Sequence, residues 1–188
     1  LFTEDAPVKF RSVDQDDYGK ATLIFNAPPD SVKVEIGDQS VEAYWETDQD
    51  SILLWYDMPT VQSFSVYLTI DTLIDTVVIK RKDKARFLED FFLNATSFNQ
   101  TAFDYQKDLT IQFNHPLSKI DTTAIYFYAD TITNRIFPKI NIDAENKRAL
   151  KINHRWKQAT NYGLVIPPNG GLDIYDLTVK DTIIQAHK

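Results

Sequence analysis

The chain has 188 residues, a net charge of −7 at pH 7 and no cysteine. The acidic balance argues against nucleic acids and anionic membranes as partners, and the lack of cysteine excludes disulfides, thiolate zinc ligands and thiol catalysis. Hydrophobic residues make up 43% of the chain, enough for folded cores, and no apolar run reaches the ~20 residues of a membrane-spanning helix. We expect a folded protein with no nucleic-acid partner and no direct insertion into a membrane.

The first half alternates short strand-like runs with turn residues. Val32, Val34 and Ile36 alternate with charged residues, and the same period of two recurs from Phe64 to Ile70. Asp, Asn, Gly and Pro fill the gaps between the runs, as expected of turns. The pattern predicts strands at Val8–Val13, Lys20–Phe25, Val32–Ile36, Val41–Glu46, Ile52–Tyr56, Phe64–Ile70 and Thr76–Lys80.

The densest cluster of charges, from Arg81 to Arg86, separates the two halves. We expect one domain over 1–82, a linker or lead-in over 83–92, and a second domain over 93–188. The run Phe87–Phe92 is compatible with one helical turn or with an extended lead-in to the next strand, and we favour the lead-in.

The second half continues the alternation of strands and turns. A turn is expected at Pro167–Gly171, followed by a single helical turn over Leu172–Leu177. Strands are predicted at Leu93–Phe98, Leu109–Phe113, Ala124–Ala129, Asn134–Pro138, Lys139–Ile142, Ala149–Asn153, Tyr162–Ile166 and Thr182–Ala186.

The phrase Phe-Asn-x-Pro occurs twice, at Phe25–Pro28 and Phe113–Pro116, each time after a strand-like run and before a polar turn. Repetition of this kind indicates two copies of one module. About seven short strands in each copy are typical of an Ig-like sandwich. We predict an all-β protein of two tandem Ig-like antiparallel β-sandwich domains, in which each Phe fills a core and each Pro ends a strand.

Several stretches of the second half carry a likeness to a known family: Thr110–Leu117 with Ile120–Thr123, Trp156–Ile166, and Asp173–Asp176 with Asp181–Ile183. They resemble the bacterial Ig-like domain of the SbsA (S-layer) type, as found in Bacteroidetes cell-surface lipoproteins. The likeness extends more weakly over 1–82 through Phe25–Pro28 and Asp50–Trp55. Asp176 stands where the family usually has Gly, a residue that often marks a positive φ.

The resemblance implies an exported protein of the cell envelope or cell surface, held by a lipid anchor outside this chain. It implies partners such as other domains of the same longer chain, a surface protein or a polysaccharide. The start at Leu1, without an initiator Met, fits a mature or excised piece. The resemblance implies no catalytic residue and no cofactor.

The tripeptide Asp-[Ser/Thr]-hydrophobic or Thr recurs along the chain and allows two readings. In the first, Asp closes a turn by accepting backbone N–H groups, and the residues after it begin a strand. In the second, the tripeptide is the acceptor for protein O-glycosylation in Bacteroidetes, as the resemblance implies. The candidate acceptors are then Ser31, Ser51, Thr72, Thr76, Thr122, Thr131 and Thr182.

Neither a metal site nor a catalytic group is predicted. The acidic run Asp14–Gly19 would need oxygen ligands where Tyr18 and Phe25 stand if it were a calcium loop, so we interpret it as a solvated turn. His115, His154 and His187 have no metal-ligand spacing, and there is no Gly-x-Ser-x-Gly motif. We therefore expect no enzyme activity and no cofactor.

Aromatic residues are the best material for a binding site. Tyr126 and Tyr128 alternate with Ile125 and Phe127, which predicts one exposed tyrosine face for a glycan or a protein partner. Trp55 is expected in a core. The sequence therefore favours a non-catalytic spacer or protein-interaction module, and the alternative is a carbohydrate-binding module that uses exposed strand aromatics.

Overall fold

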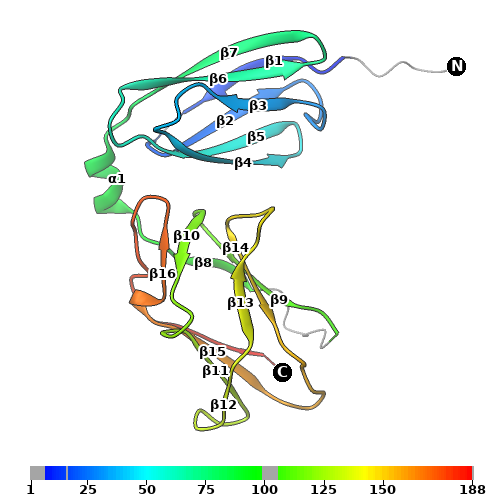
Figure 1. The fold of residues 1–188 in the computed structure, drawn as a ribbon, viewed down its shortest axis with the longest axis vertical. Coiled ribbons are helices and arrows are strands. Elements are labelled where there is room, and N and C mark those ends of the chain that lie inside the picture. The colour runs from blue at the N-terminus through cyan, green and yellow to red at the C-terminus, as the bar shows by residue number, and fades with distance from the viewer. Residues whose placement is uncertain (1–6, 16, 99–105, 188) are drawn as a thin grey trace, which may run out of the picture. The chain divides into compact units, whose positions relative to one another are not determined.

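The computed structural model describes residues 7–15, 17–98 and 106–187, and its strands pair antiparallel within several sheets (Figure 1). The predicted all-β class is confirmed: the helical elements in the described residues are one short α-helix and one 3-10 turn. The chain divides into two compact units, Leu1–Asp90 and Phe91–Lys188, which we describe separately.

Two sheets form the first unit. The larger sheet has the strand order β1-β2-β5-β4, and the smaller has the order β3-β6-β7 (Figure 1). The strands overlap the runs predicted for them, and β2 has the predicted bounds. Their bounds are β1 (Phe10–Asp14), β2 (Lys20–Phe25), β3 (Lys33–Ile36), β4 (Glu42–Asp48), β5 (Ser51–Asp57), β6 (Ser63–Ile70) and β7 (Leu73–Lys80).

Each sheet of the first unit buries one face. Leu23 and Leu54 of the larger sheet and Val66 and Leu68 of the smaller sheet are fully buried. Tyr56 and Phe64, one from each sheet, meet edge to face with ring centroids 5.2 Å apart. The period-two pattern thus produces a shared apolar layer and leaves the two opposite faces outward.

The segment expected to lead into the next strand is mostly helical. Helix α1 (Lys84–Asp90) begins after Asp83, whose carboxylate accepts the backbone N–H of Arg86 at 3.1 Å in the manner of an N-cap. Phe87 is buried against the ring of Tyr18, with centroids 5.9 Å apart. The expectation of an extended lead-in over 87–92 is wrong for residues 87–90, because the cap and this contact favour a helix.

The second unit has the sheets β13-β14-β9-β8 and β12-β11-β15-β17, and β10 pairs with β16 (Figure 1). Its apolar cluster draws buried residues from both larger sheets, among them Ile111, Phe127 and Leu164. The strand bounds are β8 (Ala95–Phe98), β9 (Leu109–Phe113), β10 (Leu117–Ile120), β11 (Tyr126–Ala129), β12 (Arg135–Ile136), β13 (Lys139–Ile142), β14 (Ala149–Asn153), β15 (Tyr162–Ile166), β16 (Gly171–Asp173) and β17 (Ile183–His187).

The connection from β15 to β17 differs from the prediction. The 3-10 turn η1 (Pro168–Gly170) occupies the expected turn, but the predicted helical turn over Leu172–Leu177 is wrong. Leu172 and Asp173 belong to β16, and a turn follows in which Asp176 has a φ of 66°. The strands β10 and β16 were not predicted together, because their pairing joins segments that are far apart in the sequence.

The two units share a strand order. The order β1-β2-β5-β4 of the first unit matches β8-β9-β14-β13 of the second, and β3-β6-β7 matches β11-β15-β17. The repeated phrase follows the second strand of each unit, and Phe25 and Phe113 are both buried with 1% exposure. The backbone N–H of Phe25 donates to Asp50, and that of Phe113 donates to Arg148, the residues just before β5 and β14.

Asn26 ties the corner after β2 to the segment that enters β1. Its backbone N–H donates to the carbonyl of Lys9, and its side-chain Oδ1 accepts the N–H of Lys9. Its Nδ2 donates to the carbonyl of Pro7 at 3.0 Å. The side chain thus acts like one more residue of a strand ladder.

Asn114 does the same in the second unit. Its backbone N–H donates to the carbonyl of Asn94 at 3.0 Å, and its Oδ1 accepts the N–H of Asn94 at 2.8 Å. Its Nδ2 donates to the carbonyl of Phe92, two residues earlier, at 2.9 Å. The same three hydrogen bonds therefore fix the same corner in both units.

Candidate functional site

The tyrosine face lies on the outer side of the sheet β12-β11-β15-β17. Tyr126 and Tyr128 are half-buried, while Ile125, Phe127 and Ala129, which alternate with them, are buried. The alternation follows from the period of two along β11. Each tyrosine ring therefore has part of its surface outward, and neither is fully exposed.

The neighbours of the two tyrosines explain their partial burial. Tyr128 pairs with Gly163, and a Cβ at that glycine would lie 1.9 Å from Cζ of Tyr128, so the ring lies across the glycine. The guanidinium carbon of Arg135 lies 4.3 Å from the ring centroid of Tyr126, within cation–π range. The exposed Ile184 continues the apolar surface on β17.

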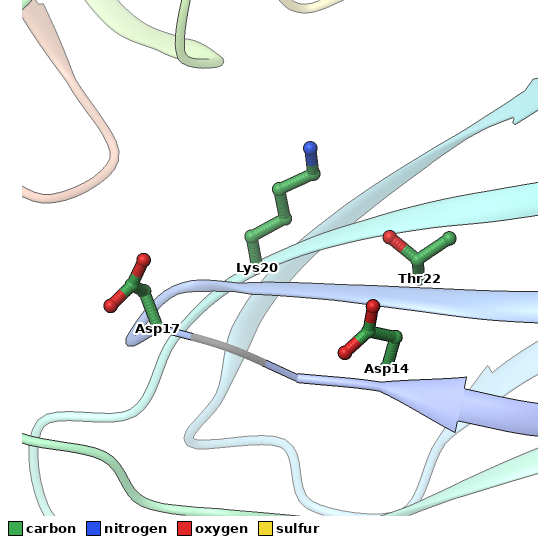
Figure 2. A pocket seen from close by; sticks show the side chains of 4 residues that line it. All are labelled: Asp14, Asp17, Lys20 and Thr22. Carbon is green, nitrogen blue, oxygen red and sulfur yellow. The ribbon is translucent and has the colours of Figure 1, made fainter.

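A small pocket lies on the outer face of the first unit (Figure 2). It has a volume of about 190 Å³ and is lined by Asp14, Asp17, Lys20 and Thr22, whose side chains project to the same side of β1 and β2. Asp14 pairs directly with Thr22 across the two strands. The pocket therefore offers carboxylate, hydroxyl and ammonium groups within one shallow depression.

Trp55 is buried next to this pocket. It is 7% exposed and pairs with Lys20, whose Nζ lies 5.2 Å from the indole centroid. Its Nε1 donates to Glu46 Oε1 at 3.0 Å. Trp55 is buried, as expected, but since Leu54 on the same strand points between the two sheets, Trp55 lies on the other face of its sheet. Polar side chains, not the opposite sheet, cover it.

The acidic run Asp14–Gly19 next to this pocket is anchored to the rest of the unit by hydrogen bonds of its uncharged side chains. Tyr18 is buried and donates to Asp57, and the Gln15 amide donates to Tyr56 Oη at 2.7 Å. Burial, followed by the hydrogen bond to Asp57, raises the pKa of Tyr18 well above its usual range. In the described part of the chain no group of three or more His, Cys, Asp or Glu could hold a metal ion, and Asp16 lies outside that part.

The most buried polar contact is a His–Asp pair in the second unit. His115 Nδ1 lies 2.7 Å from Asp173 Oδ2, and Asp173 is fully buried. Asp173 Oδ1 accepts the backbone N–H groups of Tyr175 and Leu177 at 2.9 and 2.8 Å. Ser118 Oγ donates to the carbonyl oxygen of Asp173 at 2.9 Å. This arrangement holds two loops together, and sequence reasoning missed it because the partners are distant along the chain.

The other histidines are placed differently. His154 stacks edge to face on Trp156, with centroids 5.0 Å apart, and also meets the ring of Tyr162. Burial, followed by the charge of Lys157, lowers the pKa of His154 below its ordinary value of 6.5. The side chain of His187 lies outside the described part of the structure.

Most of the candidate glycosylation residues lie at turns and strand ends, and Thr76 lies in the middle of β7. Asp121 supports the turn reading, since its Oδ1 accepts the N–H groups of Thr123 and Ala124, and Asp130 Oδ1 accepts that of Asn161. Ser51 is half-buried, and six of the candidate acceptors are exposed to solvent: Ser31, Thr72, Thr76, Thr122, Thr131 and Thr182.

In comparisons with known proteins, no family model and no curated protein matches this sequence. Among the described residues, no helix is long and apolar enough to cross a membrane.

Proposed function

We propose that this chain is a non-catalytic module of an exported surface protein, made of two tandem Ig-like sandwiches that serve as a spacer and offer edges and loops to partners. The repeated strand order carries the proposal. A sheet ordered β1-β2-β5-β4 with a sheet ordered β3-β6-β7 is the arrangement of a constant-type Ig domain, and the second unit repeats it.

The backbone of the β15–β17 connection supports the likeness to SbsA-type domains. Asp176 stands where that family usually has Gly, and its φ of 66° is the left-handed conformation that glycine adopts most readily. Asp and Asn are the other residues that tolerate this region. The departure from the family pattern thus keeps the backbone geometry that the pattern calls for.

The chemistry of the polar groups supports a structural role. Asp173 uses both carboxylate oxygens to fix His115 and a turn, and Asn26 and Asn114 fix the two corners. These side chains join loops to strands. Such cross-connections suit a domain that keeps its shape while it separates its neighbours.

A pulling experiment on the intact chain tests the spacer role. We expect two unfolding events of similar length, each releasing about 3.3–3.6 Å per residue, and full refolding after relaxation. One event that released the whole chain at once would contradict the tandem arrangement.

The cellular location needs a separate test. Intact cells of the source organism should expose the protein to an impermeant amine label, and the mass of the native protein should exceed the sequence mass if the candidate threonines and serines carry glycans. A protein labelled only after lysis would contradict export to the surface, and an unmodified mass would contradict the glycosylation reading.

A carbohydrate-binding module is the second candidate, favoured by Tyr128. A ring that lies across a glycine buries one face and keeps the other outward, which suits stacking on a sugar ring. In affinity gels with soluble polysaccharides, Tyr128→Leu should abolish any retardation, and Tyr67→Leu, on the outer face of the first unit, should preserve it. Absence of retardation on cell-wall, capsular and plant polysaccharides would contradict this candidate.

A further inference from the structure

The strand β7 forms an open edge of the first unit. It stands at the end of the order β3-β6-β7 and pairs along its whole length with β6, from Leu73 opposite Ile70 to Lys80 opposite Ser63. Its other side faces no strand among the described residues. Edge strands of this kind carry unused backbone donors and acceptors and are sites where another strand adds.

The hydrogen-bond phase of the hairpin shows which backbone groups face outward. The N–H of Arg81 donates to the carbonyl of Gln62 at 2.8 Å, which makes these two residues a hydrogen-bonded pair. In an antiparallel ladder such pairs alternate, so Leu73, Asp75, Val77 and Ile79 also bond to β6. The residues between them, Ile74, Thr76, Val78 and Lys80, therefore direct their N–H and C=O groups to the open edge.

Gln15 confirms this phase at one end of the strand. Its side-chain amide donates to the carbonyl of Lys80 and accepts the N–H of Lys80 at 3.4 Å. In the described part of the chain no hydrogen bond ends on the outward backbone groups of Ile74, Thr76 and Val78. The backbone groups of these three alternate residues thus remain available for pairing with another strand.

The side chains of the edge are apolar as well. Ile74 is 66% exposed and Val78 is 51% exposed, and both lie on the outer face of the sheet beside Thr76. Natural edge strands are commonly protected by lysines, prolines or bulges. On β7 such protection comes from Lys80 at its end, where Gln15 already covers the backbone, and from the charged Asp75 on the inward face, so the outward face from Ile74 to Val78 carries no charge.

We propose that β7 pairs antiparallel with β7 of a second copy of this chain, about a two-fold axis at Thr76, to form one continuous six-stranded sheet. In this register Ile74 lies opposite Val78 of the second copy, and Thr76 lies opposite Thr76. All three outward residues of each copy meet outward residues of the other, as a hydrogen-bonded ladder requires. The exposed β-branched side chains then become cross-strand pairs.

The neighbouring registers of a β7–β7 pair are less favourable than the one centred on Thr76, and in this register the edge of β7 is complementary to itself. A shift that centres the axis on Asp75 would place the two Asp75 carboxylates opposite each other, which is unfavourable. A shift toward Val77 would require the groups of Lys80 that Gln15 already occupies. The register at Thr76 avoids both conflicts, and it brings the turn that carries Asp71 in each copy toward the end of β7 that is followed by Arg81 in the other, so charges of opposite sign come near each other.

Sedimentation velocity tests the proposal on unglycosylated intact chain between about 1 µM and about 1 mM, the range of weak association. We expect a shift from monomer to dimer with concentration, strengthened by salt because each copy carries a charge of −7. Ile74→Lys should lower the association constant at least tenfold, since a lysine would lie opposite Val78 twice. Ile184→Lys is the matched control, because Ile184 is exposed to the same degree, 67%, on the second unit.

Amide hydrogen exchange keeps the test independent of any variant. The amides of Ile74, Thr76 and Val78 should gain protection as concentration rises, and that of Leu73 should not change, because it already bonds to β6. A chain that stays monomeric at 1 mM would overturn the proposal and leave the edge to an extended segment of a different protein. Equal loss of the dimer in Ile74→Lys and Ile184→Lys would overturn it as well.

Discussion

The two units use the same corner and differ in the connection that follows their central strand. In the first unit β6 turns into β7 through Asp71 and Thr72 alone, with Asp71 at a φ of 53°. In the second unit the connection from β15 to β17 contains η1, β16 and a further turn. The hydrogen bonds of the corner repeat in both units, whereas the connection does not, so the corner is the shared feature and the connection is one place where the two units differ.

The divergence has a physical consequence. The longer connection of the second unit brings Asp173 under the corner, where it meets His115 of the repeated phrase. The first unit has Ala27 at the matching position and a hairpin too short to reach it. The second unit thus depends on a buried polar pair for which the first unit has no counterpart.

The largest effect is expected from the shared aromatic of the corner. Phe25→Ala and Phe113→Ala each remove a ring that is 1% exposed, and each should lower the free energy of unfolding of its own unit by about 3–5 kcal/mol. Urea titrations read by Trp fluorescence would measure both changes. A variant that destabilised the other unit instead would contradict the expectation that each phenylalanine stabilises its own unit.

The units should differ in how much stability they lose when a carboxylate is removed, because the buried carboxylate Asp173 belongs to the second unit. Asp173→Ala removes the partner of His115 and the acceptor of two backbone N–H groups, so the second unit should lose about 3 kcal/mol or more. Asp71→Asn is the control, since this exposed residue sits in the hairpin of the first unit and asparagine tolerates a positive φ. Calorimetric scans showing equal losses would remove the distinction between the two connections.

The two corner asparagines should give matched, smaller effects. Asn26→Ala and Asn114→Ala each delete two side-chain hydrogen bonds to the backbone. At about 0.5–1.5 kcal/mol for each bond, either variant should lose about 1–3 kcal/mol of unfolding free energy in its own unit. Losses that differed by more than 2 kcal/mol in urea titrations would show that the corners are alike in form but not in energy.

The two units should lose stability at opposite ends of the pH range, the first in alkali and the second in acid. Burial, then a hydrogen bond with Glu42, raises the pKa of Tyr44 to about 12, and burial chiefly raises those of Tyr18 and Tyr56. A raised pKa contributes stability that is complete below the unfolded value of about 10 and is lost as the pH rises through the folded value. The first unit should therefore lose stability above pH 10.

The second unit should respond to mild acid instead. His154 has a lowered pKa, so its contribution is present above 6.5 and is lost as the pH falls. Lys151, whose pKa Asp143 raises, is exposed and screened by solvent, so it adds little at high pH. Urea titrations at about pH 5, 7.5 and 11 would measure both trends, and a first unit that weakened most at pH 5 would contradict them.

Local patterns predicted much of the fold. The bounds of β2, β9, β13, β14 and β15 coincide with the predicted runs, because in each a short apolar segment ends at a turn residue. The repeated phrase predicted the burial of Phe25 and Phe113, and both are buried. These features depend on neighbours along the chain, which a sequence displays directly.

What escaped prediction depends on contacts across the chain. Nothing local distinguishes Asp173 from the other acids, and only the folded connection brings it to His115. The helix α1 depends on Phe87 reaching Tyr18, and the outward position of Trp55 depends on the register of β5. Tyr126 and Tyr128 were predicted as an exposed face from the alternation along the strand. That pattern does not show that Arg135 lies over Tyr126 or that Tyr128 lies against Gly163.

The claim that this chain is two copies of one self-contained module is tested most directly by separating them. The fragments 1–90 and 91–188 should each unfold in one cooperative urea transition, and their near-UV circular dichroism spectra should add up to that of the intact chain. A fragment without a cooperative transition, or a sum that departs from the intact spectrum, would contradict the account.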